Sequence, residues 1–170
     1  KKYKGTFILG NFMNALGSET SKELTIKWKI DENYTFTSFI PKRDKQMIFY
    51  EEGFGQRDHK NSDFGVTVPN FYIFRNETNE TSTFVNVFEG NYKNQEIVKN
   101  VEIIESDNGN VAIQIKTSEG NDFILSSFDG DVINGYSRST DARLAVDLGN
   151  DPDSIVMFDG GFFQFPRGKI

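Results

Sequence analysis

The sequence predicts an all-β fold in which antiparallel strands form a sandwich. Aromatic residues are abundant, with 17 Phe, 6 Tyr and 1 Trp among 170 residues, and they favour half-buried pleated surfaces. Short segments of alternating apolar and polar residues recur about every ten residues, with Gly, Asn and Asp between them. No long amphipathic pattern indicates a helix. These features predict one antiparallel β-sandwich domain over residues 1–170.

The N-terminal part contains several segments with the pattern of strands. In "ELTIKWKID" (23–31) apolar residues occupy every second position, which indicates a strand with one wet face. Residues 34–40 continue the sheet and stop at Pro41, because proline cannot donate a hydrogen bond to a neighbouring strand. Residues 46–52 are a further strand candidate, whereas "FMNALG" is expected to form at most one helical turn.

Residues 51–70 form the longest segment without a strand pattern, with three Gly, one Pro and mixed charges. A loop of this length inside a compact domain often has a function, and the alternative is a surface loop without a specific role. The segment contains His59, the only histidine. A single histidine forms neither a metal site nor a catalytic triad without partners. We therefore interpret it as an exposed loop residue, with acid–base catalysis as the alternative.

The C-terminal half repeats the pattern of short strands and polar turns. The strongest hairpin joins residues 101–106 to residues 111–117, because Asn108-Gly109 suits a turn that needs positive φ. Residues 82–90 are expected to form a strand, and "EGNYKNQE" marks the polar loop that follows. The remaining strands are expected at residues 71–76, 123–127, 132–137, 143–148 and 154–158.

The composition excludes several kinds of site and partner. The chain has no cysteine, so it contains no disulfide, thiol nucleophile or cysteine metal ligand. No apolar run approaches the roughly 20 residues of a membrane helix, and no membrane partner is expected. The net charge is -6 and the last third of the chain is acidic, which repels polyanions. We therefore expect no nucleic-acid partner.

Two acidic turns raise the question of a metal ion. "FDGDV" and "DLGNDPDS" contain oxygen donors at close spacing, which could suit calcium. They lack the glycine position and closing glutamate of an EF-hand loop, and Asp, Asn and Gly also populate ordinary turns. We assign no metal ligand and no cofactor, and calcium at these turns stays open. Glu51 and Glu52 point to opposite sides of a strand, so they do not form a glycosidase pair.

Tyrosine and tryptophan rings can stack on the apolar faces of sugar rings. In a β-sandwich most of these rings are expected in the core. Tyr92 and Tyr136 lie in segments rich in Asn and Gly, so they are expected to be exposed. These two residues are candidate glycan contacts, with packing in the core or at its rim as the alternative.

One long stretch resembles a recurring pattern in heparinase II/III-like polysaccharide lyases. It is "FYIFRNETNETSTFVNVFEGNYKNQEIVKNVEIIE", in which a strand and a polar linker precede a Thr-Phe-Val-x-Val-like strand, an acidic residue and a glycine-containing loop. The segments "GNFMNALGSETSKELTIKWKI" and "MIFYEEGFGQRDH" resemble the preceding strands and loops of these lyases and of their alginate-lyase relatives. "GNDFILSS" and "RSTDARLAVDLG" resemble their closing hairpins. The resemblance covers most of the chain, and its motifs are packing motifs.

The resemblance implies a specific role. Such lyases place a helical toroid before their β-sheet domains and cleave uronic-acid-containing polysaccharides by β-elimination. Their catalytic His and Tyr residues lie in the toroid and the earlier β-region, where a structural zinc also sits. None of these residues matches a position of this chain. The chain is therefore expected to be a C-terminal β-domain, a fragment that is inactive alone and packs against upstream catalytic domains of the same protein.

The resemblance also puts the loops of this domain near one end of the glycan cleft, so an acidic polysaccharide is the second expected partner. Arg57, His59 and Lys60 are candidate glycan contacts, together with Tyr92 and Tyr136. A bacterial source and a periplasmic or extracellular location are expected.

Three functions compete on this sequence. An accessory domain of a lyase predicts an exposed apolar patch where other domains dock. An independent carbohydrate-binding module predicts an exposed aromatic platform and glycan affinity of the isolated chain. A complete small glycosidase predicts turnover that depends on one carboxylate. We favour the first function.

Overall fold

The computed structural model describes residues 2–4, 13–19, 23–54, 67–75, 82–93, 95–107, 109–149, 154–166 and 168–169. These residues form strands, turns and extended segments and contain no helix, so the predicted all-β class is confirmed. The chain divides into two compact units. Unit 1 comprises residues 1–21 and 43–78, and unit 2 comprises residues 22–42 and 79–170. Each unit is described by itself, and a single sandwich domain stays a prediction.

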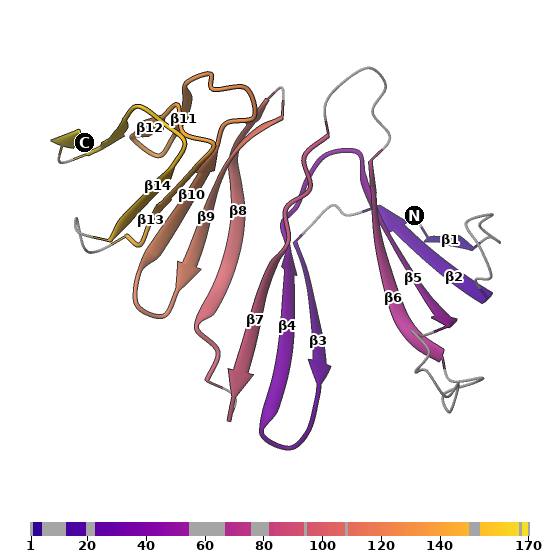
Figure 1. The fold of residues 1–170 in the computed structure, drawn as a ribbon. Helices are drawn as coiled ribbons and strands as arrows, with labels where there is room; N and C mark the ends of the chain where they lie inside the picture. The colour runs from indigo at the N-terminus through magenta and orange to yellow at the C-terminus, as the bar shows by residue number, and fades with distance from the viewer. Residues whose placement is uncertain are drawn as a thin grey trace, which may run out of the picture. The chain divides into compact units, whose positions relative to one another are not determined.

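Unit 1 contains a four-stranded antiparallel sheet in the order β1-β2-β5-β6 (Figure 1). Its strands are β1 (Lys2–Lys4), β2 (Met13–Glu19), β5 (Gln46–Phe54) and β6 (Thr67–Arg75). Residues 13–17, expected to form at most one helical turn, are extended because β2 pairs with both β1 and β5. Long-range pairing outweighs the weak local preference here.

The predicted irregular segment 51–70 was too long at both ends. Glu51 pairs with Asn70 and Phe54 pairs with Thr67, so β5 and β6 continue into it from either side. Pro69 fits because β6 is an edge strand, where a missing N–H costs no ladder hydrogen bond. Residues 55–66 lie outside the described residues.

The described residues of unit 2 form three antiparallel sheets. A three-stranded sheet has the order β3-β4-β7 and consists of β3 (Leu24–Lys29), β4 (Tyr34–Ile40) and β7 (Val87–Tyr92). A five-stranded sheet has the order β14-β13-β10-β9-β8, formed by β8 (Val98–Asp107), β9 (Asn110–Thr117), β10 (Asn121–Ser126), β13 (Leu144–Asp147) and β14 (Ile155–Phe158). A smaller sheet joins β11 (Ile133–Gly135), β12 (Arg138–Thr140), β15 (Phe163–Phe165) and β16 (Gly168–Lys169).

The five-stranded sheet is covered on both faces. Ala112, Phe123 and Leu125 form one core cluster with residues of the smaller sheet, among them Phe163. Ile113 and Ile115, which alternate with Ala112 on β9, form a second cluster with Phe39 of β4 and Val101 of β8. This arrangement explains why four consecutive residues of β9 are buried, since a strand covered on both faces has no solvent-exposed side.

The predicted hairpin between β8 and β9 is confirmed. Gly109 in its turn has a φ of 88°, a conformation that glycine adopts without a steric penalty. The strand predicted over residues 82–90 is shifted, because β7 begins at Val87 and continues to Tyr92. Tyr92 pairs directly with Tyr34 of β4, so a residue expected in a polar loop belongs to the sheet.

Candidate functional site

The structure describes two of the five candidate glycan contacts. Arg57, His59 and Lys60 lie outside the described residues. Tyr92 is the last residue of β7, and Tyr136 lies in the turn between β11 and β12. Both rings are exposed as predicted, at 47% and 54% respectively. The two residues belong to different sheets, so the structure does not join them into one site, and glycan contact by either stays a prediction.

Five aromatic side chains lie on one side of the β3-β4-β7 sheet, and we call this group the aromatic face. Its members are Trp28, Tyr34, Phe36, Phe88 and Tyr92. The rings contact one another across the strands: Tyr34 and Tyr92 have centroids 5.0 Å apart, Phe36 and Phe88 5.4 Å, and Trp28 and Phe36 5.8 Å. All except Trp28, which is half-buried, are exposed. Soluble proteins seldom leave such a contiguous apolar group uncovered unless it binds something.

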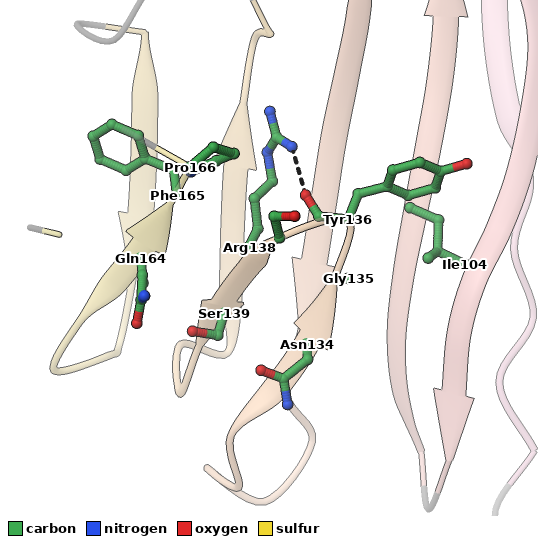
Figure 2. A pocket seen from close by; sticks show the side chains of 10 residues that line it. Ile104, Asn134, Gly135, Tyr136, Arg138, Ser139, Gln164, Phe165 and Pro166 are labelled. Atoms are coloured by element: carbon green, nitrogen blue, oxygen red, sulfur yellow. Dashed lines mark hydrogen bonds between the residues drawn. The ribbon is translucent and has the colours of Figure 1, made fainter. Parts of the chain in front are cut away.

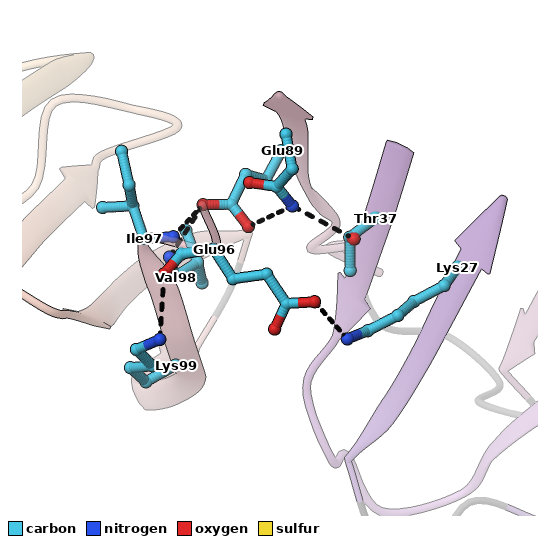
Figure 3. A network of polar contacts seen from close by, with 8 residues as sticks. Lys27, Thr37, Glu89, Glu96, Ile97, Val98 and Lys99 are labelled. Atoms are coloured by element: carbon cyan, nitrogen blue, oxygen red, sulfur yellow. Dashed lines mark hydrogen bonds and ion pairs between the residues drawn. The ribbon is translucent and has the colours of Figure 1, made fainter. Parts of the chain in front are cut away.

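The opposite side of the same sheet buries polar side chains. Thr37, Glu89 and Asn91 alternate with the aromatic residues along β4 and β7, and each is no more than 9% exposed. Figure 3 shows how this burial is compensated. Glu89 Oε1 accepts hydrogen bonds from the backbone N–H groups of Ile97 and Val98, at 2.7 and 2.8 Å. Asn91 Nδ2 donates to Glu89 Oε2 at 2.9 Å.

These contacts give the acidic residue of the long resemblance motif a structural role. A buried carboxylate is tolerated only when donors replace the lost water, and Glu89 has three donors. Glu89 fixes the start of β8 relative to β7. The segment between these two strands is also linked to β3, through an exposed ion pair of 2.5 Å between Lys27 Nζ and Glu96 Oε1 (Figure 3). This side of β4 and β7 therefore buries Glu89 and Asn91 together with the ring of Phe39, and the aromatic face lies on the other side.

The rings of the aromatic face are not all parallel, although the planes of Phe36 and Phe88 are inclined by only 14°. The planes of Trp28 and Phe36 are inclined by 42°, and those of Tyr34 and Tyr92 by 41°. Lys93 Nζ lies 5.1 Å from the centroid of the Tyr92 ring, where it makes a cation–π contact.

A second surface feature is a cleft of about 600 Å³ on the smaller sheet, which we call the Tyr136 cleft. Figure 2 shows Tyr136 beside Ile104 on one side of this cleft and Phe165 with Pro166 on the other. Polar side chains of β11, β12 and β15 also line it, and they include Asn134, Ser139 and Gln164. A concave site with apolar walls and a few polar groups is the usual form of a small-ligand site.

Buried interactions hold the base of this cleft. Arg138 Nε donates to Asp147 Oδ2 at 2.5 Å, and these side chains are only 11% and 8% exposed. The Arg138 guanidinium also lies 3.5 Å from the centroid of the Phe123 ring, and its Nη1 donates to the carbonyl oxygen of Tyr136 (Figure 2). Asp147, one of the oxygen donors in the predicted acidic turn, also accepts from the N–H of Gly149. Its carboxylate is thus engaged in the fold.

A smaller cleft of about 420 Å³ lies beside β8 and includes two carboxylates, Glu23 and Glu102. Glu102 accepts from Lys116 at 2.7 Å and from Asn100 at 2.6 Å. Burial raises the pKa of Glu23 above its ordinary value, and the charge of Glu102 adds to this effect. The hydrogen bond to Glu102 raises the pKa of Lys116. The described residues contain no group of three or more metal-binding side chains.

Comparisons with known proteins give no relative for this chain. No family model, curated protein or solved structure matches it. Among the described residues no helix could cross a membrane.

Proposed function

We propose that this chain is an accessory β-domain of a heparinase II/III-like polysaccharide lyase, one that does not itself carry out the β-elimination of uronic-acid-containing glycans. Its role is to support the catalytic part of the same protein, onto which the aromatic face docks. The resemblance of residues 71–105 to these lyases supports the family. The action of such lyases on external polysaccharides supports a periplasmic or extracellular location.

The observation that carries this proposal is the exposure of the aromatic face, since the other side of β4 and β7 is already buried in unit 2 through Phe39 and Glu89. Soluble domains seldom leave neighbouring aromatic rings uncovered, yet here Phe36 and Phe88 are 38% and 56% exposed. Covering one such ring with apolar partner atoms is worth about 1.5–3 kcal/mol. The aromatic face thus has the composition of a surface that another protein surface covers.

The composition of this face favours a protein partner over a glycan. The five side chains of the aromatic face carry no charge, and the nearby Lys93 Nζ is engaged with the ring of Tyr92, 5.1 Å from its centroid. The centres of protein interfaces are depleted in charge and enriched in Tyr, Trp and Phe. A uronic-acid polymer would instead need cations to pair with its carboxylates.

The proposal can be tested on the natural polypeptide that contains these residues, purified from the cells that make it. Heparan sulfate and alginate would be the substrates, and the ultraviolet absorbance of unsaturated uronides would be the readout. We expect lyase activity from that polypeptide. The double variant Phe36→Ser/Phe88→Ser should lose activity at a lower temperature than the unchanged protein, because the docked face would be weakened.

The matched control is Phe158→Ser, which removes a 66% exposed ring from β14, away from the aromatic face. It should leave the inactivation temperature unchanged. A natural polypeptide that releases no unsaturated uronide from either polymer would refute the lyase assignment. An equal inactivation temperature of the double variant and the control would refute docking through the aromatic face.

A further inference from the structure

Three polar side chains form a row across the smaller sheet of unit 2. Asn134 of β11 pairs with Ser139 of β12, and Ser139 pairs with Gln164 of β15. Side chains directly opposite each other in neighbouring antiparallel strands point to the same side, with Cβ atoms about 5 Å apart. Asn134 and Gln164 are exposed, and Ser139 is half-exposed. The row therefore offers two amides and a hydroxyl to a ligand in the Tyr136 cleft.

The other side of these strands explains why the row faces outward. Ile133, Thr140 and Phe163, the neighbours of the row residues along their strands, are at most 2% exposed. Their burial in unit 2 fixes the register, because a slip by one residue would turn the polar row inward and the buried side chains outward. The core thus determines the positions of the amides and the hydroxyl.

A strained turn carries an aromatic ring that lines the same cleft. Tyr136 and Ser137 connect β11 to β12 with φ values of 49° and 60°. Two positive φ values define a type I′ hairpin turn, which usually contains Asn and Gly. A larger side chain in this conformation costs about 1–2 kcal/mol, and such strain is found preferentially at functional sites. The ring of Tyr136 is 54% exposed and packs partly on Phe123, with centroids 5.8 Å apart.

The charge at the cleft argues against an anionic ligand. Among the described residues that line it, Arg138 has the only charged side chain. The charge is already paired, since Asp147 accepts from Arg138 Nε at 2.5 Å and the carbonyl oxygen of Tyr136 accepts from Nη1. A phosphate or carboxylate would have to compete with a buried carboxylate for this guanidinium, at a cost in desolvation.

We infer that the Tyr136 cleft binds a short, uncharged segment of an oligosaccharide. The amides of Asn134 and Gln164 both donate and accept hydrogen bonds, and the hydroxyl of Ser139 does the same, which suits the hydroxyl groups of neutral sugars. The ring of Tyr136 supplies an apolar surface for a sugar ring. This inference goes beyond the proposed function, because the cleft and the aromatic face belong to different sheets and glycan binding at the cleft requires no lyase.

Calorimetric titration of the 170-residue chain would test the inference. The probes would be neutral oligosaccharides derived from glucan, xylan and mannan, with alginate and heparan sulfate oligomers as anionic probes. We expect at least one neutral series to bind and the anionic oligomers to bind more weakly. Tyr136→Gly deletes the ring while keeping a residue suited to positive φ, and it should weaken binding about tenfold. Gln164→Ala, at an exposed position, should also weaken binding without affecting the fold.

A control variant and the fluorescence of tryptophan distinguish binding at the Tyr136 cleft from binding at the aromatic face. Tyr34→Ala removes a 51% exposed ring from the aromatic face, and it should leave the affinity unchanged. Trp28 is the single tryptophan and lies on that face, so sugar binding at the cleft should leave its fluorescence unchanged.

Absence of neutral-sugar binding, tighter binding of the anionic oligomers, or full affinity in both cleft variants would overturn the inference. Loss of binding in Tyr34→Ala with a shift of Trp28 emission would also overturn it and would assign the ligand to the aromatic face. The docking proposal has a separate test, because lyase activity and its inactivation temperature do not depend on the cleft.

Discussion

Arg138 and Asp147 form an ion pair in which both partners are almost fully buried, with 2.5 Å between Nε and Oδ2. The two residues come from different sheets of unit 2, since Arg138 begins β12 and Asp147 ends β13. Burial makes such a pair sensitive to the loss of one member. An unpaired charge in the interior costs far more than the intact pair contributes.

We therefore predict that Asp147→Ala destabilises the protein by about 3–5 kcal/mol, because it leaves the Arg138 guanidinium buried without a counter-charge. The double variant Arg138→Met/Asp147→Ala should be less destabilised than Asp147→Ala alone, since it removes both charges. Urea denaturation of the three proteins would measure these differences. Additive losses, with the double variant the least stable, would contradict the buried-pair interpretation.

Glu89 provides a second prediction, on the connection between β7 and β8. Glu89→Ala removes the acceptor for the N–H groups of Ile97 and Val98 and for the amide of Asn91. Leaving these groups without a partner should cost about 2–5 kcal/mol. Glu89→Gln keeps one carbonyl oxygen for the two backbone groups, so we expect a loss of only about 1 kcal/mol.

Hydrogen exchange would locate the effect of the Glu89 substitutions. The amides of Ile97 and Val98 should exchange faster in Glu89→Ala than in Glu89→Gln, while amides in the centre of β9 should change less. Protection of Ile97 and Val98 in Glu89→Ala equal to that in the unchanged protein would show that the carboxylate does not hold this connection. Lys27→Ala is a useful comparison, because its exposed pair with Glu96 should contribute less than about 1 kcal/mol.

Asp122 on β10 should make stability depend on pH. Burial raises its pKa above the ordinary value of 3.8, and the charges of Asp147 and Glu119 add to this effect. A raised pKa means that the folded state holds the proton more tightly than the unfolded state does. The resulting stabilisation is present below pH 3.8 and is lost as the pH rises through the raised pKa.

The substitution Asp122→Asn should therefore stabilise the protein near neutral pH and change little in acid. The gain should not exceed about 1 kcal/mol, because the carboxyl group is only partly buried and solvent screens it. Urea denaturation near neutral pH and below pH 3.8 would measure the gain in the free energy of unfolding. The same gain at both values would show that the charge of Asp122 is not its source.

Local sequence patterns were sufficient to predict the fold class and many strands. The alternation in residues 23–31 and the Asn-Gly turn at residues 108–109 are short-range features, and both segments have the predicted form where they are described. Tyr92 was misplaced in a loop because Asn and Gly beside it have low strand propensity. Its pairing with Tyr34, far away in the sequence, decides its conformation.

The orientation of the β3-β4-β7 sheet could not be predicted from the sequence. Alternation shows that Phe88 and Glu89 face opposite sides, but hydropathy alone would place the phenylalanine inside. The structure places Glu89 inside, because the backbone of Ile97 and Val98 returns to meet its carboxylate. The polar row of the Tyr136 cleft was missed for a similar reason, since the pairing of Ser139 with Gln164 joins distant segments. Neither β12 nor β15 has a strong alternating pattern of its own.

Two glycines in unit 2 give a last prediction about packing. A Cβ atom added at Gly160 would lie 2.5 Å from Cα and Cβ of Ala142, which is fully buried in the core. Because backbone cannot move aside easily, Gly160→Ala should cost about 1–3 kcal/mol through overpacking. Gly90→Ala is the matched control, since a Cβ atom there meets nothing within 4 Å. It should change stability by less than about 0.5 kcal/mol. Thermal unfolding of both variants would measure the difference. Equal melting temperatures would contradict this prediction, because they would show that the backbone around Ala142 can move to accommodate the added Cβ atom.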